Sequence, residues 1–181
     1  NRNERSPMPM KTIAVLATLD TKGQEAEFLR EQLKALGSKA LLVDMGVLGK
    51  PAARADVTRK QVAKLGGTPL PALQKDPSRE AAQPVMAAGA IKVLQRRLKA
   101  GTLHGVIGLG GLQGTAGCTM VMRALPYGVP KVMVSTVASG DTAAFVGIKD
   151  ITMMFSVGDI LGPFLLAARG CWSVRVRGRP S

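Results

Sequence analysis

Residues 105–118 read GVIGLGGLQGTAGC, and this stretch decides how the rest of the chain is interpreted. An apolar run of strand length leads into a turn with glycine at positions 108, 110, 111 and 114, and the residues beyond predict a helix. Glycine permits positive φ angles and lets main-chain amides approach an anion, which the N-terminus of the next helix would also attract. The turn predicts a phosphate-binding loop; the alternative is that it only lets the helix pack closely on the strand.

Apolar runs of strand length alternate with helical periodicity along the rest of the chain. Strands are predicted at 12–19, 40–43, 105–109, 131–134 and 151–155, and helices at 22–36, 58–65 and 80–99. Prolines and paired glycines make 49–80 an irregular excursion that contains the short 58–65 helix. This order is typical of buried parallel strands joined by helical crossovers. We expect an α/β fold in three layers, with an open, doubly wound, mostly parallel Rossmann-like sheet.

The composition is that of one globular domain. The chain has 181 residues, 46% of them apolar, which is enough for a sizeable core. Its longest apolar runs are far shorter than the ~20 residues of a membrane span, so we expect a cytoplasmic protein without a membrane partner. Cys118 and Cys171 offer no disulfide framework, and His104 is too isolated to complete a metal cluster with them. We expect both thiols to be packing residues and His104 to be structural.

The formal net charge of +13 raises the question of nucleic-acid binding, because clustered Lys and Arg side chains bind phosphate backbones. Four arginines fall within the last thirteen residues, however, and only 3% of residues are aromatic, which leaves few platforms for stacked bases. Nucleic acid is therefore a less favoured partner than a small phosphate-bearing ligand.

Small and polar residues follow the predicted strands, and ligands of such sheets bind outside the carboxyl ends of the strands. The first strand is followed by TLDTKGQE, the second by Asp44, the third by GLGGLQGT and the fourth by STVASGD. Thr115 can add a hydroxyl and Lys22 a cation, while Asp20 or Asp141 can hold Mg²⁺ against phosphate oxygens. The alternatives are N-capping by either aspartate and a solvated Lys22.

Two familiar nucleotide fingerprints do not fit the glycine turn. A P-loop needs Lys and then Ser or Thr after its last glycine, whereas Gly114 is followed directly by Thr115. The dinucleotide fingerprint follows the first strand and has glycine at its sixth position, where this turn has Gln113. A nicotinamide cofactor is thus a poorer match, and no catalytic serine arrangement is recognisable in the sequence.

Three segments together resemble a known family: ATLDTKGQEAEFL, GVIGLGGLQGTAGCTMVMRALPYGVPKVMVSTVASGD and DITMMFSVGDILG. They are similar to the hallmarks of the ATP-binding domain family of the tomato mosaic virus resistance protein and its uncharacterised bacterial and fungal homologues. The resemblance runs from about Lys11 to Gly162 and implies the first, N-terminal Rossmann-like half of a domain that a second α/β half follows. In the plant protein, this domain binds ATP and the viral replication helicase.

The resemblance implies ATP as the ligand, and the chemistry of the candidate residues adds Mg²⁺. Carried over to this sequence, the candidate nucleotide contacts are Asp20, Thr21, Lys22, Gly23, Gly110, Gly111, Gly114, Thr115, Ser135, Thr136, Ser139, Gly140 and Asp141. They fall in the same strand-end loops that the residue pattern selects. Two departures are Leu112, where the family usually has serine, and the absence of the expected continuation after Gly162.

These observations predict a nucleotide-binding domain with no assigned reaction, because the sequence identifies no pocket for a phosphate acceptor. We expect residues 1–9 to be a non-native or flexible extension, 10–162 to be the nucleotide-binding half-domain, and 163–181 to be an atypical tail. Apolar residues such as Phe164, Leu165 and Trp172 predict a homo-oligomer contact or a contact with a second half-domain. The alternative functions are a protein-interaction or oligomerisation domain with nucleotide as a structural ligand, and a basic phosphate-backbone binder.

Overall fold

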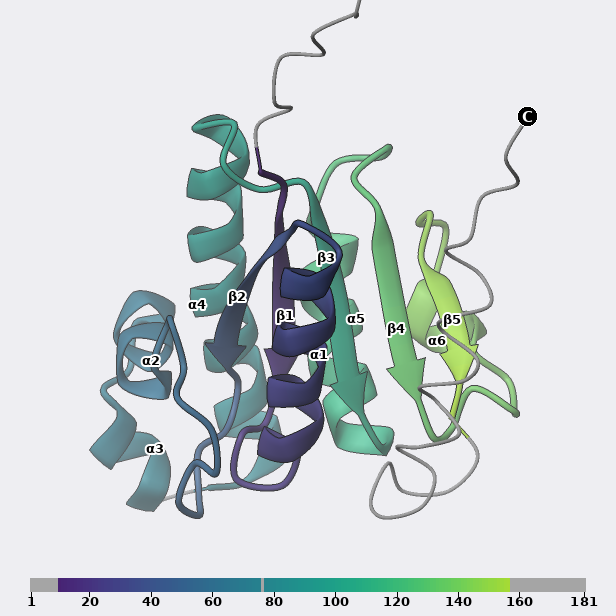
Figure 1. Ribbon diagram of the computed structural model, residues 1–181. Coiled ribbons are helices and arrows are strands. Elements are labelled where there is room, and N and C mark those ends of the chain that lie inside the picture. The colour runs from purple at the N-terminus through teal and green to yellow at the C-terminus, as the bar shows by residue number, and fades with distance from the viewer. Residues whose placement is uncertain (1–9, 76, 157–181) are drawn as a thin grey trace, which may run out of the picture.

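The computed structural model describes residues 10–75 and 77–156 (Figure 1). The elements are, in chain order, β1 (Thr12–Ala17), α1 (Gly23–Ala35), β2 (Lys39–Asp44), α2 (Arg59–Gly66), α3 (Leu70–Lys75), α4 (Arg79–Lys99), β3 (Gly105–Gly110), α5 (Leu112–Arg123), β4 (Lys131–Ser135), α6 (Ala143–Val146) and β5 (Thr152–Phe155). The expectations for residues 1–9, for the 163–181 tail and for Cys171 lie outside the described residues. Within these ranges, no helix is long and apolar enough to cross a membrane.

The strands form one sheet in the order β2-β1-β3-β4-β5, and every neighbouring pair is parallel. All five strands lie where the apolar runs predicted them, with ends that differ by a few residues at most. The central strand β3 is buried along its whole length, as expected of a parallel strand covered on both faces. The expected open, parallel α/β sheet is therefore confirmed.

Helices cover the sheet on two sides (Figure 1). Leu29 and Leu33 of α1 belong to the core on one face. Met86 and Leu94 of α4, together with Met122 of α5, belong to the larger core on the other face. Each of these three helices is long enough to present an apolar stripe to the strands, and burial of that stripe supplies most of the helix's stability. The three layers of the predicted fold are confirmed.

The strand order creates one point where connections diverge. From β1 the chain turns through α1 to β2 on one side, whereas from β3 it turns through α5 to β4 on the other side. In open α/β sheets, ligands bind in the crevice at such a switch point, outside the carboxyl ends of the strands. Here the crevice falls between the residues that follow β1 and those that follow β3.

The irregular excursion contains more helix than the sequence predicted. The expected short helix is α2, which begins with a capping box in which Thr58 and Gln61 exchange side-chain and backbone hydrogen bonds. The second short helix, α3, was not predicted, because Pro69 and Pro71 flank its first residue. Proline is tolerated in the first turn of a helix, where its missing N–H costs no intrahelical bond.

Candidate functional site

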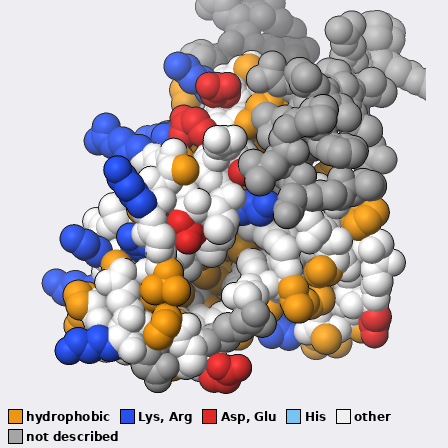
Figure 2. All heavy atoms as spheres, turned by 90° about the horizontal axis from the view of Figure 1, so that it is seen from below, with side chains coloured by type: hydrophobic (Ala, Val, Ile, Leu, Met, Phe, Trp, Pro, Cys, Tyr) orange, Lys and Arg blue, Asp and Glu red, His pale blue; other side chains and the backbone are white. Residues whose placement is uncertain are grey.

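A cavity of about 510 Å³ opens at the switch point. Its walls come from Thr18 and residues 20–22 after β1, from 45–48 after β2, from 110–114 at the end of β3 and the start of α5, and from the facing sides of α4 and α5. Figure 2 views the molecule from this end and shows the hollow, with hydrophobic side chains around it and basic side chains gathered on the side of α2 and α3. The cavity thus lies where the fold places ligands.

The glycine turn forms the β3 side of the cavity, but its glycines do not have the positive φ angles that the sequence suggested. Among the described residues, positive φ occurs at other glycines, and Gly111 has a φ of −78°. A Cβ on Gly110 would lie 2.5 Å from the Cα of Gly114, so Gly110 is required for close packing of α5 on its own strand. A Cβ on Gly111 would meet only Thr136 Oγ1, at 3.5 Å. Packing therefore explains Gly110 and does not explain Gly111.

The first turn of α5 presents backbone donors to the cavity. Gly111 is the N-cap residue and provides no side-chain cap, and the first intrahelical bond runs from the Thr115 amide to the Gly111 carbonyl, at 2.8 Å. The three amides before it, of residues 112–114, have no partner within the helix. Residues 110–114 all line the cavity. The helix dipole and these amides make this wall attractive to an anion.

The β1 loop forms the opposite wall and carries both signs of charge. Lys22 lines the cavity although it is only 7% exposed, and its Nζ lies 3.3 Å from Glu25 Oε1. Asp20 is the one acidic side chain among the lining residues. Lys22 is the N-cap residue of α1 and its side chain does not cap the helix, so Asp20 is not the N-cap of α1. The loop therefore brings a cation and a carboxylate to the cavity.

Glu25 is a buried residue that pairs with Lys22 and does not itself line the cavity. It is 2% exposed, and its Oε2 has no hydrogen-bond partner among the described residues. Its Oε1 pairs with the Lys22 ammonium. Because a buried carboxylate is costly without a cation, Glu25 and Lys22 depend on one another for stability.

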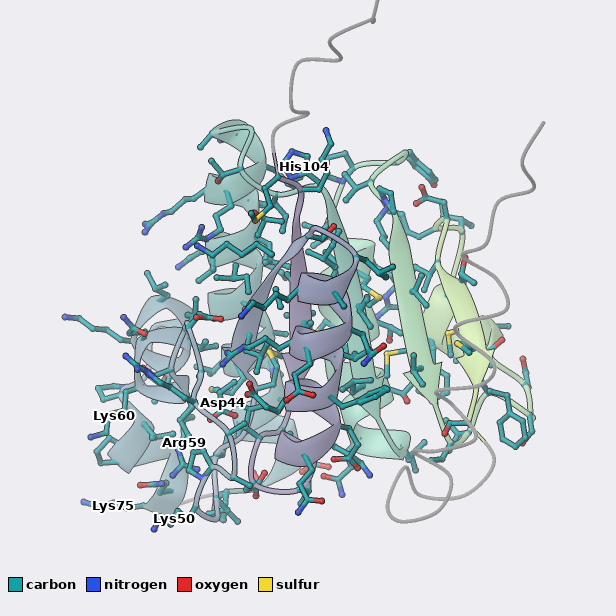
Figure 3. All side chains as sticks on the ribbon, in the orientation of Figure 1. Asp44, Lys50, Arg59, Lys60, Lys75 and His104 are labelled. Carbon is teal, nitrogen blue, oxygen red and sulfur yellow. The ribbon has the colours of Figure 1, made fainter. Side chains whose placement is uncertain are left out.

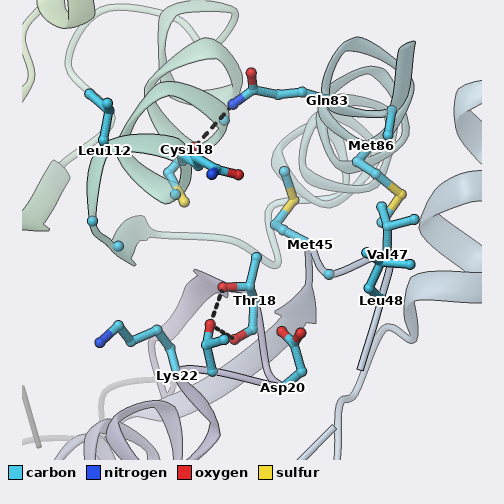
Figure 4. Close-up of a pocket in the computed structure, with 18 of the residues that line it drawn as sticks. Thr18, Asp20, Lys22, Met45, Val47, Leu48, Gln83, Met86, Leu112 and Cys118 are labelled. Atoms are coloured by element: carbon cyan, nitrogen blue, oxygen red, sulfur yellow. Dashed lines mark hydrogen bonds between the residues drawn. The ribbon is translucent and has the colours of Figure 1, made fainter. Parts of the chain in front are cut away.

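The structure brings together six of the predicted site residues as cavity lining: Asp20, Thr21, Lys22, Gly110, Gly111 and Gly114. Gly23 lies beside them, and its missing side chain leaves room for Ala52, whose Cβ would otherwise be 2.8 Å away. Thr21 is held by a 2.9 Å hydrogen bond between its hydroxyl and that of Thr18 (Figure 4).

The residues predicted from the β4 loop do not line the cavity, and neither does Thr115. The hydroxyls of Thr115 and Ser135 lie 2.6 Å apart, fully buried, and join α5 to β4. Asp141 Oδ1 accepts a 2.9 Å hydrogen bond from the Ala143 amide at the start of α6. Thr136 is half-buried, whereas Ser139 and Gly140 are exposed, and all three lie outside the lining.

Asp44 connects the first two loops of the site. Its Oδ1 accepts hydrogen bonds from the amides of Leu19, at 3.2 Å, and Gly46, at 2.9 Å, and its side chain is almost completely buried. Burial raises the pKa of this carboxyl above its usual value, against the opposing effect of the two backbone hydrogen bonds. Asp44 is thus a structural residue at the end of β2 and not a lining residue.

Cys118 and His104 behave as the sequence suggested. Burial raises the pKa of the Cys118 thiol to about 12, so the sulfur stays protonated within the core and donates to the Leu16 carbonyl at 3.5 Å. His104 lies at the opposite end of the molecule from Asp44 and the basic residues of α2 and α3 (Figure 3), and its Nδ1 accepts a 3.0 Å hydrogen bond from the Thr12 amide. In the described part of the chain, no three His, Cys, Asp or Glu side chains gather to hold a metal ion.

Sequence reasoning missed the remaining wall of the cavity. Met45, Val47 and Leu48 come from the loop after β2, and Gln83 and Met86 come from α4 (Figure 4). Asp44 was named in the sequence because ligands of such sheets bind at strand ends. By the same rule, the residues that directly follow Asp44 could have been predicted to line the site. The contribution of α4 depends on how α4 lies against α5, which no local pattern reveals.

Comparison with known proteins identifies relatives of this chain. The family profile described as "Uncharacterised protein family (UPF0261) N-terminal domain" matches residues 11–166. A UPF0261 protein of Clostridium tetani is 43% identical over 159 residues, which are 88% of this chain and 39% of that protein. A UPF0261 protein of Rhizobium meliloti is 39% identical over 153 residues, or 84% of this chain and 37% of that protein. The chain therefore spans less than two-fifths of the length of these relatives.

A shorter match connects the chain to a plant protein. The ToMV resistance protein Tm-1(GCR237) of Solanum lycopersicum is 52% identical over 60 residues, which are 33% of this chain and 8% of that protein. The similarity to the tomato protein that the three sequence segments suggested is therefore present, over a third of the chain.

Proposed function

The chain belongs to the UPF0261 family as its N-terminal domain, and on that premise we propose that it binds ATP with Mg²⁺ in the switch-point cavity. The observation that carries the proposal is the convergence, on one cavity, of an uncapped helix N-terminus, a buried lysine and one carboxylate. These are the groups that bind a phosphate chain and its metal ion. The choice of ATP among nucleotides rests on the family resemblance of the strand-end segments.

The phosphates of the nucleotide bind at the first turn of α5. The amides of residues 112–114 donate hydrogen bonds to phosphate oxygens, and the dipole of the twelve-residue helix favours their negative charge. The open space at Gly111 supports this assignment, because no internal contact requires a glycine there. Thr115 lies one residue beyond the turn, with its hydroxyl committed to Ser135, and is not a ligand in this proposal.

Lys22 supplies the cation of the site. Its ammonium has three donors, so it can contact a phosphate oxygen while it keeps the 3.3 Å pairing with Glu25. The low exposure of Lys22 strengthens such a contact, because little water competes with the phosphate or screens the charge.

Asp20 is the residue that we assign to Mg²⁺, and Asp141 is not. Mg²⁺ is usually held by one or two carboxylates together with phosphate oxygens and water, and Asp20 is the acidic residue that lines the cavity. Asp141 is exposed and already accepts the Ala143 amide.

Calorimetric titration of matched variants tests the role of Lys22. Removing Lys22 alone would leave Glu25 as a buried carboxylate, so the useful comparison is Glu25→Gln against Glu25→Gln combined with Lys22→Met. We expect Glu25→Gln to bind Mg·ATP at least as tightly as the parent. We expect the double variant to bind about 10- to 100-fold more weakly, because a hydrogen bond to a charged group is lost. Equal affinity of the two variants, both folded by circular dichroism, would exclude Lys22 from the site.

The metal assignment has its own control. Asp20→Asn should weaken binding of Mg·ATP more than binding of ATP in excess chelator, whereas Asp141→Asn should change neither affinity. An Asp141→Asn variant that loses the Mg²⁺ dependence would move the metal to the β4 loop and contradict the assignment.

A further inference from the structure

The side chains that the loop after β2 and α4 contribute to the cavity are apolar except for Gln83, and we call this part of the cavity its apolar end. Met45, Val47 and Leu48 line it from the loop after β2, and Ala82 and Met86 line it from α4. Figure 4 shows the two methionines with Val47 and Leu48 on one side of the cavity, and Lys22 with Leu112 on the other. A single cavity therefore has a charged end and an apolar end, as a ligand with a phosphate chain and an aromatic base requires.

Several backbone polar groups of the loop that forms the apolar end are hydrogen-bonded within the protein. The Met45 amide donates to the Ala17 carbonyl at 2.8 Å, and the Gly46 amide donates to Asp44 Oδ1 at 2.9 Å. The carbonyls of Val47 and Leu48 accept from the side chains of Gln74, at 2.9 Å, and Arg59, at 2.6 Å. What the loop offers to the cavity is therefore chiefly its aliphatic and thioether side chains.

Among the lining residues that α4 and the loop after β2 contribute, Gln83 is the one whose side chain can form hydrogen bonds. Its Nε2 donates to the main-chain carbonyl of Gln113 at 3.0 Å, across the gap between α4 and α5. The amide is thus engaged in holding the two helices together. A bidentate contact with the hydrogen-bonding edge of a base would require this bond to break.

We propose that this apolar end is a purine subsite that holds the base by its faces and does not read its hydrogen-bonding edge. The subsite rests on the proposed nucleotide function, which it refines from ATP to purine nucleoside triphosphates in general. Methionine sulfur makes favourable contacts with aromatic rings, and Met45 and Met86 lie in the wall. Leu48 is 51% exposed, so the cavity is open at its side and the polar edge of the base stays in water.

This arrangement limits how far the site can discriminate between bases. Strong discrimination requires buried polar groups that are left unpaired by the wrong ligand, whereas apolar contacts separate similar ligands by only about 10- to 200-fold. ATP and GTP differ in the exocyclic groups of an edge that this subsite leaves to water. They should therefore bind almost equally, and each should bind more tightly than a phosphate chain without a base.

The test is calorimetric titration of the full chain with the Mg²⁺ complexes of ATP, GTP and tripolyphosphate. We expect the two dissociation constants for ATP and GTP to agree within about tenfold, and tripolyphosphate to bind at least about tenfold more weakly. Leu48→Ser should weaken ATP and GTP equally, by about five- to tenfold, and leave tripolyphosphate unchanged. The matched control is Leu36→Ser, at the C-cap of α1, where a leucine of similar exposure (49%) lies outside the cavity.

The outcomes separate the two proposals. Tripolyphosphate that binds as tightly as ATP would overturn the purine subsite and leave the phosphate site intact. A preference of more than about 100-fold for ATP over GTP would show that the site recognises the hydrogen-bonding edge of the base. That result would also overturn the purine subsite. A Leu48→Ser variant that binds ATP as tightly as Leu36→Ser does would also overturn the purine subsite. A folded parent chain that binds none of the three ligands would overturn the phosphate site and the subsite together.

Discussion

Replacing Gly111 by aspartate should stabilise the fold and strongly weaken nucleotide binding at the same time. Gly111 is the N-cap of α5, with φ −78° and ψ −157°, an extended conformation that aspartate adopts readily. A Cβ there has one neighbour within 4 Å, at 3.5 Å, so the side chain fits. Its carboxylate would accept hydrogen bonds from the amides at the second or third helical position. These are the amides that we assign to the phosphates.

The two effects differ in sign and in size. The added cap and its charge beside the helix dipole should raise the free energy of unfolding by about 0.5–1 kcal/mol. For a chain of this length that corresponds to a rise in Tm of roughly 1–4 °C. A carboxylate about 4 Å from a phosphate charge repels it by about 4 kcal/mol at an effective dielectric constant near 20. The affinity for Mg·ATP should therefore fall on the order of 10²- to 10³-fold.

Thermal unfolding and calorimetric titration on the same preparations measure both effects. Gly111→Ala is the matched control, because it adds the same Cβ without a carboxylate and should weaken Mg·ATP binding far less than Gly111→Asp does. A Gly111→Asp protein that is folded and binds Mg·ATP like the control would refute the placement of phosphates at α5. A Gly111→Asp protein that melts well below the parent would refute the description of Gly111 as an uncapped position with free space.

Three further predictions concern stability. Gly110→Ala should lower the free energy of unfolding in urea by about 2–3 kcal/mol, because its Cβ would lie 2.5 Å from the backbone of α5; unchanged stability would refute the packing role. Thr115→Val should cost about 1–2 kcal/mol, since it leaves the buried Ser135 hydroxyl without its 2.6 Å partner, yet Mg·ATP binding should persist; lost binding in a folded variant would restore Thr115 as a ligand. The hydrogen bond from Lys131 holds the pKa of Asp150 below its ordinary value near 3.8, so this carboxylate stabilises the fold above that pH and ceases to do so as pH falls through the lowered pKa. The stability difference between the parent and Asp150→Asn should therefore be present at pH 7, shrink as the pH falls below the ordinary carboxyl pKa, and be lost only below the lowered pKa of Asp150; a difference that grows on acidification would contradict the pairing.

The fold was predictable because its strands are buried on both faces. Such strands appear in sequence as continuous apolar runs, and each run here ends near a glycine, a proline or a polar residue that breaks it. The order of the strands in the sheet was not predictable from these local patterns. Helix α3 was missed because the prolines at its start resemble a loop signal, although the first turn of a helix accepts them.

The candidate site was predicted in part, and for a reason that turned out to be incomplete. The loops after β1 and β3, two of the strand-end loops to which the sequence pointed, line the cavity. The role given to the glycines was wrong in its geometry, because Gly110 serves close packing and neither it nor Gly111 has a positive φ. The apolar wall of Met45 and Met86 was missed, since it depends on tertiary contacts between α4 and the loop after β2. Sequence periodicity carries no information about that contact.

The measurement that tests the central claim most directly is calorimetric titration of the parent chain with Mg·ATP, Mg·ADP and AMP. If the phosphates bind at the first turn of α5, binding should be saturable with one site per chain, and affinity should rise from AMP to ADP to ATP. Absence of heat from a folded sample, or equal affinity for AMP and ATP, would contradict the account and leave the glycine turn with a packing role alone.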